Sequence, residues 1–175
     1  FALKGVYPFG ENSALVVDGV HQYTAFYREL SEQLGKGTGW TWSAHAMGYN
    51  FYGLFCYYLC SPFSFLILLF MKFMYVNEAV TAVILIKAGL CSVSMAWYSG
   101  KKYPGRGSMA VSLGCMYALS DFLIGYYNNV MWLDCIMLLP VLAYLIEQLV
   151  HTGKWRGYCL VLGYCILTSY YMGFM

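Results

Sequence analysis

The chain has 175 residues, of which 61% are hydrophobic and only 10% are charged, and its net charge is +2. Because soluble domains usually carry about 25% charged residues, this composition argues against an ordinary soluble protein. No dense basic run indicates nucleic acid binding, and the sequence has no Walker loop, nucleotide fingerprint or hydrolase nucleophile elbow. It therefore predicts an all-α, polytopic membrane protein.

Both ends of the sequence lie inside apolar stretches. The chain begins with Phe1-Ala-Leu, without Met, and ends with the segment Ser169 to Met175. We therefore expect a fragment of a longer membrane domain. The seven cysteines include no CxxC pair, so we interpret them as small buried hydrophobic residues and not as a metal or disulfide framework.

Residues 1–77 are predicted to form a large extracytoplasmic loop that carries interfacial helices. Residues 18–37 have apolar side chains at helical spacing on one face and charged ones, including Glu29, on the other, which predicts an amphipathic helix. Residues 51–75 are apolar enough to span a membrane, but Ser61-Pro62 interrupts them. We expect an interfacial or re-entrant segment there, since a full span would move the next basic loop outside the cell.

Four transmembrane helices are predicted in the rest of the chain, because a span needs about 20 mostly apolar residues. They cover residues 78–98, 109–127, 130–150 and 158–175. The connecting loops 100–107 and 151–157 are short and basic and contain no acid. The positive-inside rule places both loops in the cytoplasm. The turn around Asn128 and Asn129, and residues 1–77, then face outward, so Asp18 and Asp134 approach the same side.

Asp18 is the residue with the clearest chemical possibilities. It stands where an N-cap residue would satisfy the free amides of the first helix, and it could equally deprotonate an acceptor hydroxyl as a general base. His21, Gln22 and Tyr23 follow closely and are predicted to bind or orient the substrate. His21 has no second histidine at metal-ligand spacing, so no metal or other cofactor is predicted, although a divalent metal is not excluded.

Lys87 lies near the centre of the first predicted span. A charge at that depth costs several kcal/mol and normally faces protein or a polar cavity. Two interpretations are open: Lys87 pairs structurally with Asp121 or Asp134, or it binds the phosphate of a lipid-linked donor.

The outer turn supplies three more candidates for substrate binding, Asn129, Trp132 and Asp134. Asparagine and aromatic residues also fit an ordinary turn at the membrane interface. Near the opposite end of the same predicted helix, Glu147 and His151 are interpreted as a solvated pair.

A set of motifs, in order along nearly the whole chain, resembles the YfhO family of bacterial multispanning membrane proteins. Each motif alone is weak, but the ordered set is specific. The matching stretches are Tyr7-Pro-Phe-Gly10, Asp18-Gly-Val-His-Gln-Tyr23, Gly48-Tyr-Asn50, Tyr57-Tyr-Leu-Cys-Ser-Pro-Phe63, Lys87, Ala118-Leu-Ser120, Asn129-Val-Met-Trp-Leu-Asp134, Leu139-Pro140 and Ser169-Tyr-Tyr-Met-Gly173.

This resemblance implies a glycosyltransferase of the GT-C architecture in the bacterial plasma membrane. Such an enzyme takes a sugar from a polyprenyl-phosphate carrier on the outer face and passes it to a cell-surface polymer such as lipoteichoic acid. A carboxylate in the first outer loop is the usual catalytic base of that architecture, and Asp18 occupies the corresponding place. The implied partners are the lipid-linked donor, the polymer acceptor and the bilayer, without nucleic acid.

Two other functions stay open at this point. In a transporter or flippase, Lys87, Asp121 and Asp134 would form a polar pathway and Asp18 would only cap a helix. A noncatalytic subunit of an envelope-assembly complex would need none of these residues for chemistry.

Overall fold

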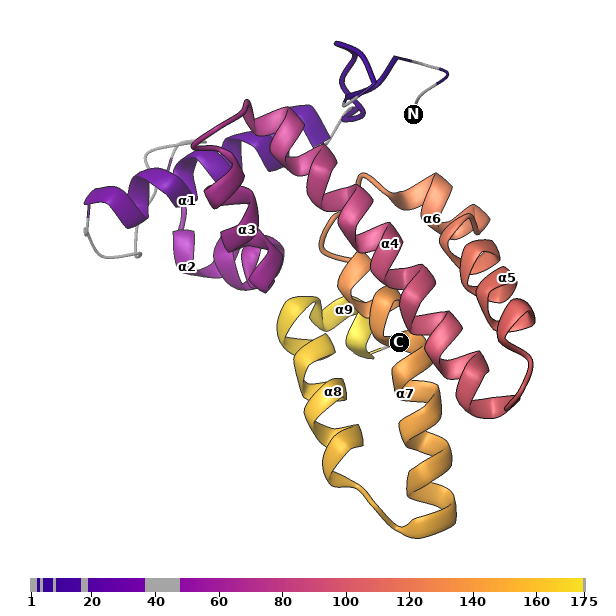
Figure 1. Ribbon diagram of the computed structural model, residues 1–175. Helices are drawn as coiled ribbons and strands as arrows, with labels where there is room; N and C mark the ends of the chain where they lie inside the picture. The colour runs from indigo at the N-terminus through magenta and orange to yellow at the C-terminus, as the bar shows by residue number, and fades with distance from the viewer. Residues whose placement is uncertain (1–2, 4, 8, 17–18, 37–47, 175) are drawn as a thin grey trace. The chain divides into compact units, whose positions relative to one another are not determined.

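The computed structural model describes the chain except for residues 1–2, 4, 8, 17–18, 37–47 and 175. Its regular elements are helices (Figure 1), and the described residues contain one isolated β-bridge but no strand. In chain order the helices are a π-helical turn Gly19–Tyr23, α1 (Thr24–Lys36), α2 (Phe51–Leu54), a π-helical segment Phe55–Leu59, α3 (Pro62–Phe70), α4 (Val76–Lys102), α5 (Gly107–Ala118), α6 (Asp121–Tyr126), α7 (Leu133–Thr152), α8 (Arg156–Thr168) and α9 (Tyr170–Phe174). The all-α prediction is confirmed.

The chain divides into two compact units, residues 1–83 and residues 84–175. In the first unit, Tyr23, Tyr27 and Leu30 form the buried face of the π-helical turn and α1. The ring of Tyr58 lies edge-on to Tyr23, with centroids 5.8 Å apart, and thereby joins this face to the Phe55–Leu59 segment. Glu29 was expected on the charged face but is buried, and its Oε1 accepts a long hydrogen bond of 3.4 Å from Gln33.

The apolar stretch after residue 50 does not form one straight helix. The two halves, Phe51–Leu59 and Pro62–Phe70, meet at an angle of 96°. Ser61 begins the second half as an N-cap, since its hydroxyl oxygen accepts a hydrogen bond of 3.2 Å from the Phe63 amide, and Pro62 fits the first helical turn. The break at Ser61-Pro62 therefore has a local cause in the sequence.

Among the described residues, three stretches are long and apolar enough to cross a membrane, or four if the bent pair is counted as one span. The three are α4, the α5–α6 stretch Gly107–Tyr126, and α7. Large apolar side chains are exposed on their flanks, for example Val93 and Val111, as expected for surfaces that face lipid. The chain is therefore a polytopic membrane protein.

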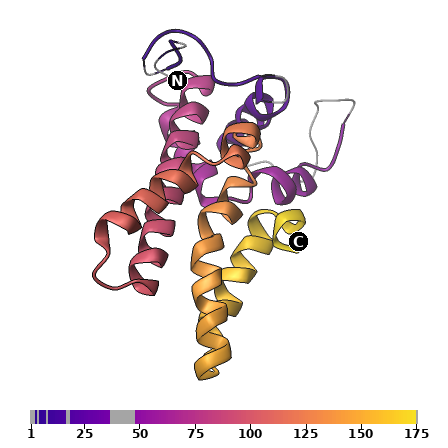
Figure 2. The ribbon, with the colours of Figure 1, turned by 90° about the vertical axis from the view of Figure 1, so that its right-hand side faces the viewer.

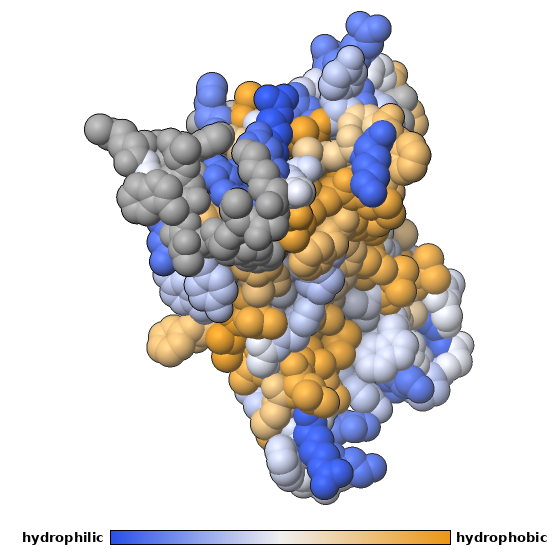
Figure 3. All heavy atoms as spheres, turned by 90° about the vertical axis from the view of Figure 1, so that its left-hand side faces the viewer, coloured by the Kyte–Doolittle hydropathy of each residue, from blue (hydrophilic) through white to orange (hydrophobic). Residues whose placement is uncertain are grey.

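The fourth predicted span, residues 158–175, has a different form. α8 has 13 residues, and Ser169 adopts an extended backbone (φ −157°, ψ 92°) that separates it from the short α9. α7 and α8 run antiparallel (Figures 1 and 2), joined by a turn in which Gly153 takes the left-handed conformation (φ 69°). The tip at this turn is hydrophilic, whereas apolar side chains cover much of the flank above it (Figure 3).

A close approach between α4 and α5 depends on Gly114. A Cβ atom at this position would lie 2.5 Å from the backbone oxygen of Ser92, which is too close for any side chain. On the same helix, the hydroxyl of Tyr117 donates a hydrogen bond of 2.7 Å to the carbonyl of Ile136 and so connects α5 to α7. α5 therefore contacts both α4 and α7 within the second unit.

We expect Gly114→Ala to destabilise the protein by about 1–3 kcal/mol, because the added methyl group must push α5 away from the backbone of α4. Thermal unfolding of the full-length protein in detergent measures this loss. Gly89→Ala is the matched control, since a Cβ atom there meets nothing within 4 Å. Equal melting temperatures for the two variants would contradict the close approach.

Candidate functional site

A buried ion pair connects α4 to the beginning of α7. Lys87 Nζ donates a hydrogen bond of 2.7 Å to Asp134 Oδ2 and another of 2.9 Å to the carbonyl of Val130. Both charged side chains are 0% exposed. The ammonium group therefore holds a carboxylate and a backbone carbonyl within the interior of the second unit.

The location of this pair explains how two charges are tolerated inside an apolar helical bundle. Each charge neutralises the other, and the carboxylate lies in the first turn of α7, where the helix dipole favours a negative group. Of the two partners considered for Lys87, the structure pairs it with Asp134. Asp121 is exposed at the first position of α6.

The turn held by Lys87 also carries a group of aromatic rings. Trp132 stacks on Tyr171 of α9, with centroids 6.1 Å apart and an interplanar angle of 27°. Its other neighbour is Tyr126 of α6, at 5.7 Å. Both tyrosines are about half exposed. The amide of Trp132 donates a hydrogen bond of 2.9 Å to the carbonyl of Asn129, so the substrate-binding candidates of this turn form one compact group.

Two buried polar atoms of this group have no hydrogen-bond partner among the described residues. They are Nε1 of Trp132 and Oδ1 of Asp134. Leaving a buried donor or acceptor unsatisfied costs about 1–3 kcal/mol, and such atoms commonly bind water or a ligand. The turn therefore offers one free hydrogen-bond donor and one free acceptor beside an otherwise apolar bundle.

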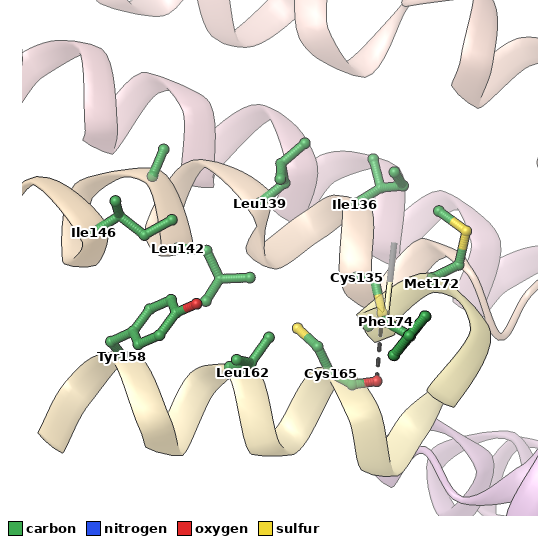
Figure 4. A pocket seen from close by; sticks show the side chains of 12 residues that line it. Cys135, Ile136, Leu139, Leu142, Ile146, Tyr158, Leu162, Cys165, Met172 and Phe174 are labelled. Carbon is green, nitrogen blue, oxygen red and sulfur yellow. Dashed lines mark hydrogen bonds between the residues drawn. The ribbon is translucent and has the colours of Figure 1, made fainter. Parts of the chain in front are cut away.

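An apolar groove of about 540 Å³ begins next to Asp134 and lies between α7, α8 and α9. At one end, Cys135 donates its S–H to the carbonyl of Cys165 at 3.5 Å, with Met172 and Phe174 close by (Figure 4). At the other end lies Tyr158, opposite the later turns of α7 (Figure 4). From Cys135 to Ile146 the groove follows α7 for roughly 16 Å, at about 1.5 Å per residue.

The site residues predicted in the first unit differ in their exposure and do not form one described cluster. His21 is exposed, and Gln22 is half-buried. Tyr23 is 1% exposed, and its ring packs edge-on against Tyr58 in the interior of this unit. Asp18 lies outside the described residues.

The sequence did not predict the polar cluster near the other end of α4 and α7. Glu147 was interpreted as a solvated partner of His151, but it accepts hydrogen bonds from the hydroxyl of Tyr98, at 2.9 Å, and from Lys102. The available signal was that Tyr98 and Glu147 lie near the same end of two predicted spans, with Lys102 just beyond the first of them. Among the residues that the structure describes, no group of three or more His, Cys, Asp or Glu side chains could hold a metal ion.

The whole chain, residues 1–175, matches the family model described as bacterial membrane protein YfhO. No curated protein and no solved structure matches the chain significantly. The family match covers both compact units and all of the candidate residues, from Asp18 to Asp134.

We expect Lys87→Met to destabilise the protein by about 3–5 kcal/mol, because it leaves the carboxylate of Asp134 buried without its counter-charge. Asp134→Leu should have a similar effect by leaving the ammonium group unpaired. The double variant should recover much of the loss, since it removes both charges. Thermal unfolding of the four proteins measures the coupling, and additive losses would contradict a mutually dependent pair.

Proposed function

Because this chain belongs to the YfhO family of bacterial membrane proteins, we propose that it acts as a membrane glycosyltransferase of the GT-C type. Its donor is a sugar on a polyprenyl phosphate, and its acceptor is a cell-surface polymer such as lipoteichoic acid. The observation that carries this proposal is the apolar groove that begins beside the polar turn at Asp134.

A lipid-linked donor needs two adjoining environments, an apolar path for its tail and a polar site for its sugar and phosphate. The groove between α7 and α8 supports the first requirement, since aliphatic, thiol and aromatic side chains line most of it. The turn with Asn129 and Trp132 supports the second, with two half-exposed tyrosine rings beside it and buried unsatisfied polar atoms. Consecutive residues, Asp134 and Cys135, connect the two environments.

The proposed reaction transfers the sugar in one displacement. The acceptor oxygen forms the new bond to the anomeric carbon while the bond to the carrier phosphate breaks, and the phosphate leaves with the electron pair. Asp18 takes the proton of the acceptor hydroxyl as general base. His21 and Gln22 precede the interfacial α1 and are proposed to orient the acceptor.

Lys87 enters this proposal as a positioning residue. Its ammonium group is fully buried and is bound to Asp134 and to the Val130 carbonyl, so it fixes the turn that carries Trp132. The same geometry gives less support to a transport pathway through Lys87, Asp121 and Asp134. Two of these residues neutralise each other in the interior, and the third is exposed.

Asp18→Asn should abolish or greatly lower glycosylation of the wall polymer, by at least about 100-fold if Asp18 is the general base. Asn can still cap a helix, so protein abundance should stay unchanged. The polymer glycosylation profile of cells that carry the full-length variant measures the effect. Asp121→Asn is the control for the same chemical change at an exposed position, and normal glycosylation by Asp18→Asn would refute the role of Asp18.

The proposed orientation is testable separately. In a full-length protein without its native cysteines, Asn128→Cys should react with a membrane-impermeant maleimide added to intact cells. Lys101→Cys should react only after the cells are opened, because the positive-inside rule keeps its loop in the cytoplasm. Labelling of Lys101→Cys from outside would overturn the orientation.

A further inference from the structure

We propose that the turn between α7 and α8 binds the headgroup of an anionic phospholipid. This turn encloses a hollow of about 420 Å³ at the end of the helical hairpin opposite to the polar turn of Trp132. Its lining combines two cations, an indole, an amide and an apolar residue, namely Lys154, Arg156, Trp155, Gln148 and Leu145. The proposal is independent of the glycosyltransferase function.

Two glycines shape the hollow. Gly153 ends α7 in the left-handed conformation, and its amide donates a hydrogen bond of 2.9 Å to the carbonyl of Leu149. At the start of α8, a Cβ atom on Gly157 would lie 2.9 Å from Cδ2 of Leu145. The backbone of α8 therefore begins directly against α7, and Leu145 gives the hollow an apolar side.

The positive charge of the hollow has no counter-charge among the residues that the structure describes. Lys154 and Arg156 are exposed, and neither forms an ion pair among the described residues. The connecting segment from His151 to Gly157 contains no acid. The nearest acid along α7 is Glu147, which already binds Lys102 and Tyr98. An external anion is therefore the natural partner of the two cations.

The position of the hollow favours a lipid headgroup over a free anion. It lies at the hydrophilic end of a hairpin, and apolar side chains cover much of the flank of that hairpin (Figure 3). A hairpin whose apolar flank crosses the hydrocarbon core has its polar end at the level of the phospholipid phosphates. Trp155 is 58% exposed there, and indole rings prefer this interfacial region. Lys154 and Arg156 can bind the phosphate, while Leu145 and Trp155 contact the glycerol and the first carbons of the acyl chains.

The other basic loop provides a matched control. Lys101, in the last turn of α4, and Arg106, directly before α5, are exposed and lie outside the hollow. A double substitution of these two residues also removes one lysine and one arginine charge, but from a different place. Any general attraction between basic loops and an anionic membrane surface changes equally in both double variants, so a difference between them reports the hollow itself.

The test uses the full-length protein in detergent, titrated with phosphatidylglycerol and with phosphatidylcholine, and counts bound lipids by native mass spectrometry. We expect a preference for phosphatidylglycerol. Lys154→Gln/Arg156→Gln should weaken its binding roughly 30-fold, since each cation near an anionic surface contributes about 1 kcal/mol. Lys101→Gln/Arg106→Gln should retain most of the affinity.

Three results would overturn the proposal. The wild-type protein could bind both lipids equally, or the two double variants could lose the same affinity, which would indicate only a general surface effect. In the third case, inorganic phosphate at millimolar concentration would displace phosphatidylglycerol completely, which would indicate a site for free anions. Thermal unfolding without added lipid should be the same for all three proteins, because the substituted side chains are exposed.

Discussion

The second unit depends on one buried ammonium group. Lys87 reaches from α4 to both the carboxylate of Asp134 and the carbonyl of Val130, so a single charge connects a long helix, the start of another and the turn before it. A bilayer offers these groups no water, and each must find its partner within the protein. This requirement fixes the register of α4 against α7 more narrowly than apolar contacts, which tolerate small displacements.

The register set by this pair determines which side chains of α7 face α4 and which face α8. Asp134 points to Lys87 on α4, while the next residue, Cys135, contacts α8 at the beginning of the apolar groove. The polar turn and the groove are therefore adjacent because consecutive residues of a helix point in different directions. This adjacency is the structural basis of the proposed lipid-linked donor site, in which a polar headgroup and an apolar tail must be bound together.

A second ion pair joins the same two helices, but it is partly exposed to solvent, so its contribution to stability is different. Lys102 and Glu147 are 41% and 37% exposed, and ion pairs of this kind contribute about 0–1 kcal/mol. Removing one partner there leaves the other solvated, whereas removing one partner of Lys87 and Asp134 leaves a charge in the interior. Glu147 also affects the charge distribution. Because Glu147 binds Lys102, the cations Lys154 and Arg156 at the α7–α8 turn have no ion-pair partner in the described part of the chain.

The sequence by itself determined the helical class, the polytopic membrane character and the break at Ser61-Pro62, because apolar length, charge frequency and capping chemistry are local properties. It also identified Lys87 as a residue that needs a partner, but it left Asp121 and Asp134 as alternatives. Only the tertiary structure decided between them and revealed the Val130 carbonyl, the burial of Glu29 and the groove beside Cys135. These features depend on the register between helices, and many registers bury similar apolar area, so periodicity in one sequence cannot select among them.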